Sequence, residues 1–106
     1  MITPESADRR LQTIAGHAAA GEFEQAEAQA KILAEDLGRA SRPVYPDYKT
    51  ARSGRAPAWD AHHQRYAAAL PHVKTAVVRA AHADSAGTLE SIEKARAAFA
   101  PRQEAK

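Results

Sequence analysis

The sequence predicts an all-α protein: a four-helix, mainly antiparallel bundle with a long kinked third helix and a long irregular loop between helices two and three. Two observations support this fold class. Large residues recur every three or four positions in four stretches of the chain, whereas a half-buried strand would need a period of two. Glycine and proline lie between those stretches, where helices end. The 106 residues suffice for one domain, so residues 1–106 are expected to form a single helical unit.

The first two helices are expected to form a hairpin within residues 1–38. Thr3 followed by Pro4 is typical of a helix start, because the hydroxyl caps the backbone and proline fits the first turn. Gly21 ends this helix and opens the second, and Gly38 has the position of a C′ residue. The connection is short, so the two helices should be antiparallel. The apolar stripes comprise Ala7, Leu11, Ile14 and Ala18, then Phe23, Ala26, Ala30, Leu33 and Leu37.

The third helix is expected over residues 58–83 and should reach about 39 Å. Pro71 lies inside it and removes one backbone hydrogen bond, which favours a kink. The apolar stripe keeps its phase across this proline, which favours a single helix over two. His63 is expected to be partly buried and bonded to Asp60, and the alternative is a pH-sensitive or ligand-contacting group. The stripe comprises Trp59, His63, Tyr66, Leu70, Val73, Val77 and Ala80.

The last helix is expected within residues 84–101, with a frayed tail over 102–106. Asp84 or Ser85 provides the N-cap, and Pro101 ends the helix. Leu89, Ile92 and Phe99 should line its inner side. Arg96 occupies a position where an apolar residue would be expected, so it should either extend along the bundle edge or pair with an acid of the second helix.

The segment between helices two and three, residues 39–57, is the best candidate for function, and we call it the basic segment. Its five basic residues and one acid give a net charge of +4, whereas the ten basic and twelve acidic residues elsewhere give −2. Arginine binds phosphates and carboxylates through two parallel hydrogen bonds, and tyrosine can anchor an interface or stack on a base. The predicted partner-binding residues are Arg39, Arg42, Tyr45, Tyr48, Lys49, Arg52 and Arg55.

Two structural interpretations of the basic segment compete with recognition. It could lie on the acidic second helix, with Tyr45 and Tyr48 filling gaps in the bundle. Alternatively, its charges could only keep a long loop solvated. Loops of this length inside small domains are usually functional or disordered.

The remaining sequence argues against several classes of function. The absence of cysteine excludes disulfides and thiolate metal sites, and no two of the five histidines have the i, i+4 spacing that shares a metal on one helix. No metal, cofactor or catalytic residue is predicted, so we expect a protein that is not an enzyme. No membrane span or secretory signal is evident, which favours a cytoplasmic protein. With 27 alanines and 20 larger apolar residues, the core should be thin, which makes a homodimer a reasonable expectation.

The leading hypothesis from the sequence is therefore a small non-catalytic interaction module, a regulator, adaptor or inhibitor that binds a protein partner through the basic segment. The alternative is nucleic-acid binding through the same segment and the flank of the third helix, which adds Arg65, Lys74 and Arg79. A third hypothesis is a ligand pocket between helices, lined by Trp59, His63 and Tyr66.

Overall fold

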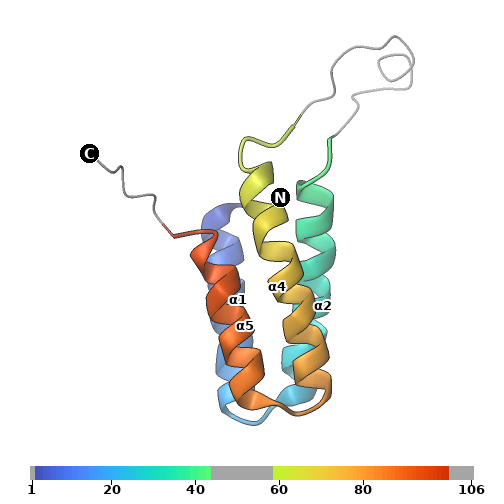
Figure 1. Cartoon of the computed structure of the whole chain (residues 1–106), viewed down its shortest axis with the longest axis vertical. Helices are drawn as coiled ribbons and strands as arrows, with labels where there is room; N and C mark the ends of the chain where they lie inside the picture. The colour runs from blue at the N-terminus through green and yellow to red at the C-terminus, as the bar shows by residue number, and fades with distance from the viewer. Residues whose placement is uncertain (1, 44–58, 101–106) are drawn as a thin grey trace.

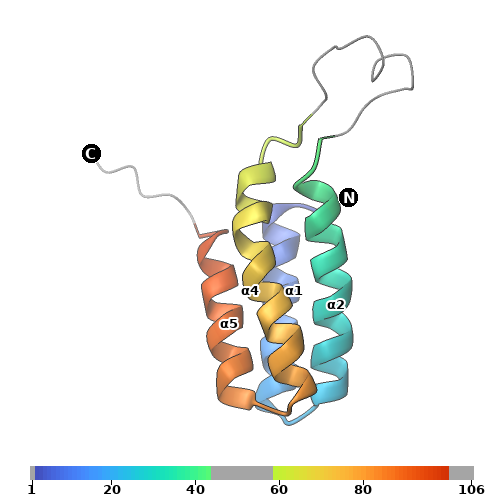
Figure 2. The ribbon, with the colours of Figure 1, turned by 45° about the vertical axis from the view of Figure 1, so that its right-hand side comes forward.

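A computed structural model describes residues 2–43 and 59–100, and within these ranges four α-helices form an antiparallel bundle (Figure 1). Each helix packs beside its neighbour in sequence, and α1 and α5 close the ring (Figures 1 and 2). No strand occurs in the described ranges, so the all-α bundle is confirmed. The helices are α1 (Pro4–Ala19), α2 (Phe23–Ala40), α4 (His63–Ala81) and α5 (Ser85–Ala97).

The two ends of the bundle differ. The α1–α2 and α4–α5 connections lie together at the lower end in Figure 1. At the upper end α1 and α4 begin and α2 ends; we call it the basic end, for the arginines described below. None of the described helices is long and apolar enough to span a membrane.

The first hairpin forms where the sequence predicts it. Thr3 caps α1, with its hydroxyl accepting a hydrogen bond from the Ser6 N–H at 3.0 Å. Gly21 adopts φ = +80° after α1, a conformation that costs glycine little. The N–H of Glu22 then donates to the His17 carbonyl at 2.8 Å, which is the 6→1 hydrogen bond of a Schellman motif. This turn reverses the chain and places α2 antiparallel to α1.

Helix α2 continues past Gly38, so the predicted end of this helix is wrong. Gly38 is buried inside α2, and Ser41 is the C-cap. The Gly38 carbonyl accepts hydrogen bonds from Ser41 Oγ at 3.0 Å and from Arg42 Nε at 2.9 Å. These side-chain donors extend the ordered end of α2 beyond the glycine. Arg39 therefore belongs to the last helical turn rather than to a loop.

Helix α4 is shorter than predicted, because it begins at His63 and ends at Ala81. Its 19 residues span about 28 Å at the usual rise per residue, rather than about 39 Å. The backbone before it forms a turn in which the Asp60 carboxylate accepts from the His62 N–H at 2.7 Å. The helix is continuous through Pro71, as expected, and its kink stays a prediction.

The predicted stripe on the third helix is correct in phase but wrong at its start. Trp59 precedes the helix and is 50% exposed, so it does not begin the core. Leu70 and Val77 are partly buried at the edge of the core rather than at its centre. Alanines occupy three of the five buried positions of α4. The residues of α4 that the core buries are Tyr66, Ala69, Val73, Ala76 and Ala80.

Helix α5 begins at the predicted cap, where the Asp84 carboxylate accepts from the Gly87 N–H at 2.9 Å. Ile92 and Phe99 are buried as expected, and Leu89 is partly buried. The helix ends at Ala97 rather than near residue 101, and Phe99 packs just beyond it. Arg65 of α4 holds this end, because its Nε donates to the Ala98 carbonyl at 2.9 Å. The predicted tail, 102–106, lies outside the described residues.

Candidate functional site

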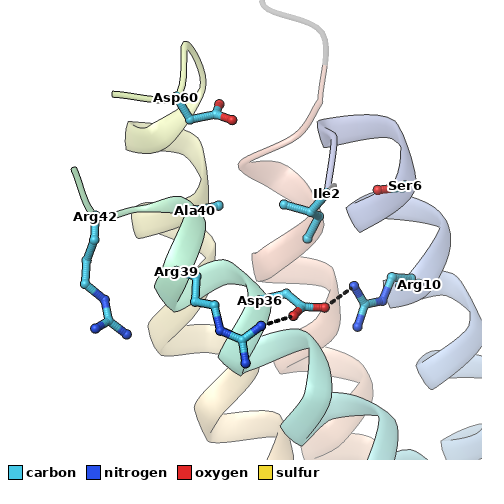
Figure 3. Close-up of a pocket in the computed structure, with 8 residues that line it drawn as sticks. All are labelled: Ile2, Ser6, Arg10, Asp36, Arg39, Ala40, Arg42 and Asp60. Atoms are coloured by element: carbon cyan, nitrogen blue, oxygen red, sulfur yellow. Dashed lines mark hydrogen bonds and ion pairs between the residues drawn. The ribbon is translucent and has the colours of Figure 1, made fainter. Parts of the chain in front are cut away.

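A cavity of about 670 Å³ opens at the basic end of the bundle. It lies between the start of α1, the last turns of α2 and the turn before α4 (Figure 3). Its volume is within the range of small-molecule and side-chain binding pockets. The described lining residues are Ile2, Ser6, Arg10, Asp36, Arg39, Ala40, Arg42 and Asp60.

Asp36 lies between two arginines at the wall of this cavity (Figure 3). Its Oδ2 accepts from Arg10 Nη1 at 2.8 Å, and its Oδ1 accepts from Arg39 Nη1 at 3.2 Å. Arg10 comes from α1, whereas Arg39 lies one turn after Asp36 on α2. The Asp36 and Arg10 side chains are each 31% exposed, and the Arg39 side chain is 71% exposed. The carboxylate is therefore anchored to α1 while the outer guanidinium faces solvent.

The apolar part of the cavity wall is tied to the core through the N-terminal residues. Ile2 and Ala40 are partly buried and pack against the core beneath the cavity. The Tyr66 hydroxyl donates to the Ile2 carbonyl at 3.3 Å. Burial raises the pKa of the Tyr66 phenol above its ordinary value, and the charges of Asp60 and Glu5 act in the same direction. The phenol thus stays protonated and keeps donating to the N-terminal segment.

Arg42 follows the C-cap of α2 and points away from Asp36 (Figure 3). It also lines a second cavity of about 390 Å³, between α2 and α4, together with Leu70 and Lys74. Arg39 and Arg42 therefore project to different sides of the C-terminal end of α2. A ligand that contacted both would have to cross the end of α2.

The turn before α4 forms the opposite rim of the basic end. Trp59 stacks on His63 with ring centroids 4.5 Å apart. His63 Nδ1 donates to the Asp60 backbone carbonyl at 2.9 Å. Asp60 is therefore the partner of His63, as expected, but through its backbone oxygen rather than its carboxylate.

Two of the seven predicted partner-binding residues fall in the described ranges. Arg39 and Arg42 lie together at the end of α2, and both line the cavity at the basic end. The possible packing of the basic segment on α2 involves residues 44–57, which lie outside the described residues. The other predicted residues, Tyr45, Tyr48, Lys49, Arg52 and Arg55, lie outside them too.

Sequence reasoning missed Arg10 and Asp36, which form the centre of the cavity wall. They lie 11 and 15 residues on either side of Gly21, and the antiparallel hairpin brings their long side chains together. The spacing of Asp36 and Arg39 would also have indicated a pair on one helix face. The sequence does not predict this pair, because it places the end of the second helix at Gly38, before Arg39.

The three cations proposed as the nucleic-acid flank of the third helix do not form one stripe. Arg65 turns toward the end of α5 and donates to the Ala98 and Ala100 carbonyls just beyond it. Arg79 pairs with Asp84 at 3.4 Å, also on the α5 side. Lys74 lies on the other side of α4, beside α2.

The aromatic residues proposed for a ligand pocket also separate. Tyr66 is buried against Phe99, with ring centroids 6.0 Å apart, while Trp59 stays on the surface. The cavities described above are lined by other side chains. Within residues 2–43 and 59–100, no three histidine or carboxylate side chains gather as metal ligands would.

Arg96 pairs with an acid, but with one on a different helix from the one predicted. Its Nε donates to Asp8 of α1 at 2.8 Å, not to an acid of the second helix. The reason is the ring order of the bundle, in which α5 contacts α1 and α4. The hydrogen bond from Arg96 lowers the pKa of Asp8 below its ordinary value, and partial burial opposes this.

Comparisons with known proteins give no family for this chain: no family model, no curated protein and no solved structure matches it.

Proposed function

We propose that the protein is a small non-catalytic interaction module, acting in the cytoplasm as a regulator, adaptor or inhibitor that binds a protein partner at its basic end. The observation that carries this proposal is that Arg39 and Arg42, the first two cations of the basic segment, both line an open cavity. Arginine and aromatic residues dominate the binding energy of many protein interfaces. Half-exposed Trp59, directly before the lining residue Asp60, adds such an aromatic surface.

The test is capture of the partner from cells that express the protein naturally. Replacing Arg42, Tyr45, Tyr48 and Arg52 together by alanine should abolish capture while the melting temperature stays nearly unchanged. The matched control removes two cations elsewhere, through Arg9→Ala on α1 and Lys94→Ala on α5, and should still capture the partner. If the four-residue variant loses its cooperative melting, the basic segment is structural and this proposal is wrong.

Nucleic-acid binding by the same basic segment is the alternative, favoured by the +4 charge that the sequence concentrates there. It requires that affinity fall steeply with salt, because phosphate contacts release counterions. A mobility-shift assay on duplex and single-stranded substrates measures this directly. Capture that survives nuclease treatment of the lysate favours the protein partner instead.

Self-association belongs to the same proposal. Eight of the sixteen buried hydrophobic residues in the described core are alanines, which bury little area each. Ile32 and Val78 remain about half exposed on the outside of α2 and α4. Sedimentation equilibrium over a range of protein concentrations would show a dimer if these surfaces associate, and a single monomer mass would contradict it.

A further inference from the structure

We infer that the cavity at the basic end binds a carboxylate side chain of an acidic peptide segment, which takes the position that Asp36 now holds between Arg10 and Arg39. This inference rests on the proposed function, because it names the chemistry of the protein partner. It assigns binding to Arg10 of α1, which the sequence did not single out, together with Arg39 of α2.

The arrangement around Asp36 shows that the two guanidiniums accommodate a carboxylate. They approach different oxygens of the same group, at 2.8 Å from Arg10 and 3.2 Å from Arg39. Hydrogen bonds from arginine to carboxylate are among the stronger ones in proteins, and they fix orientation. Arg39 is mostly exposed, so an incoming carboxylate can reach it without moving a helix.

The cavity in front of this pair has room for more than one side chain. Its volume of about 670 Å³ exceeds that of a single carboxylate, and Ile2 and Ala40 supply an apolar wall. An acidic side chain next to an aliphatic one would therefore match both parts of the wall. Such a peptide buries apolar area and places its charge at the arginines.

The charges of the wall favour a carboxylate over a phosphate. The charged residues of the described lining are three arginines and two acids, which sum to a net charge of +1. A group with a single negative charge balances this excess. A phosphate monoester carries up to two charges and would be repelled more strongly by the two acids.

Asp36 acts as an internal competitor in this arrangement. A peptide carboxylate must share the guanidiniums with it or displace it. Removing the charge of Asp36 should therefore tighten peptide binding, whereas a purely structural ion pair would leave binding unchanged or weaken it. The sign of this effect separates the two interpretations.

The experiment measures binding of a short blocked peptide of alternating glutamate and leucine, fluorescently labelled, to the full chain by anisotropy. Asp36→Asn should bind about threefold to tenfold more tightly than the wild type, and Arg10→Gln about tenfold more weakly. The matched control is Arg9→Gln, an exposed neighbouring arginine of α1 outside the described lining of this cavity, which should change affinity less than about twofold. A peptide with glutamine in place of glutamate should not bind.

Two results would overturn the inference: unchanged or weaker binding by a folded Asp36→Asn variant, or equal binding of the glutamine peptide. If Asp36→Asn does not fold, Arg10→Gln and the glutamine peptide decide the question with the wild-type chain. Binding of a single-stranded oligonucleotide with no binding of the acidic peptide would also overturn it.

The proposed function and this inference fail in different ways. A captured partner whose binding is insensitive to Asp36→Asn and Arg10→Gln contradicts the carboxylate site only. A lysate that yields no protein partner, together with charge-dependent peptide binding, contradicts the proposed function but supports the site.

Discussion

Two ion pairs join residues that are 26 and 88 positions apart in the sequence, and each links one pair of neighbouring helices in the ring. Arg10 and Asp36 connect α1 to α2, while Asp8 and Arg96 connect α1 to α5. All four groups keep part of their surface in water, so each pair contributes little to stability on its own. Their main effect is to set which helix faces meet, because a wrong rotation of α1 would separate both pairs.

The pair between Asp8 and Arg96 predicts a pH dependence of stability. The hydrogen bond from Arg96 lowers the pKa of Asp8 in the folded chain, so the folded state holds this proton less tightly than the unfolded state. The stabilisation is therefore present above the unfolded pKa and is lost as pH falls through the folded value. Asp8→Asn should lower the free energy of unfolding by about 0.5 kcal/mol at neutral pH and by nearly nothing near pH 2.

Urea denaturation followed by circular dichroism at both pH values measures this difference. Glu90→Gln, which removes an exposed acid of α5, is the control and should show no such pH dependence. If Asp8→Asn lowers the free energy of unfolding equally at both pH values, the pH dependence does not come from the pair between Asp8 and Arg96.

The ends of the helices depend on local side-chain bonds that periodicity does not report. Spacing predicted the four helices, and residue type predicted the Thr3 cap and a cap at either Asp84 or Ser85. The late end of α2 depends on Ser41 and Arg42 bonding the Gly38 carbonyl. The late start of α4 depends on the turn at Asp60. Neither bond could be predicted without knowing how the side chains fold back.

The position of Gly38 gives a direct test of the corrected end of α2. A Cβ there would meet only the Arg42 Nη2 atom, at an ordinary contact distance of 3.5 Å. Because alanine favours helix over glycine, Gly38→Ala should raise the free energy of unfolding by about 0.5–1 kcal/mol. Chemical denaturation measures this change in the free energy of unfolding. A glycine that ended the helix in a left-handed conformation would instead give a loss of about 1 kcal/mol.

The opposite result is expected at Gly87, in the first turn of α5. A Cβ there would overlap the Asp84 carboxylate and the Arg79 side chain, which pair beside it. Gly87→Ala should therefore displace the N-cap and lower the free energy of unfolding by about 1 kcal/mol despite the better helix former. Gly16→Ala is the matched control, since nothing lies within 4 Å of its Cβ. Equal effects of the two substitutions would contradict the cap geometry.

At the scale of the whole molecule, the antiparallel bundle explains why the candidate site lies at one end. The hairpin register brings the start of α1 beside the end of α2, which places Arg10 next to Asp36. The sequence could indicate Arg39 and Arg42 as candidate binding residues from local charge alone. It could not indicate Arg10, because its partner is 26 residues away and only the completed hairpin brings the two together.

Replacing residues 44–58 with a short glycine and serine linker tests whether the helical bundle folds without the residues proposed to recognise the partner. Helices α2 and α4 are antiparallel neighbours, and short connections suffice to join such helices. The buried core of the described residues comes from the four helices and the residues flanking them, so the replaced chain should keep its helical circular dichroism. Its melting temperature should fall by no more than about 5 °C, equivalent to about 1 kcal/mol.

The same variant should lose capture of the protein partner while it retains binding of the acidic peptide at Arg10 and Arg39. Both assays use one protein preparation, and a linker of scrambled residues 44–58 is the control for composition. Loss of cooperative melting would mean that the replaced residues belong to the core. If the variant still captures the partner fully, residues 44–58 are not needed for recognition, and the partner binds the helical bundle instead.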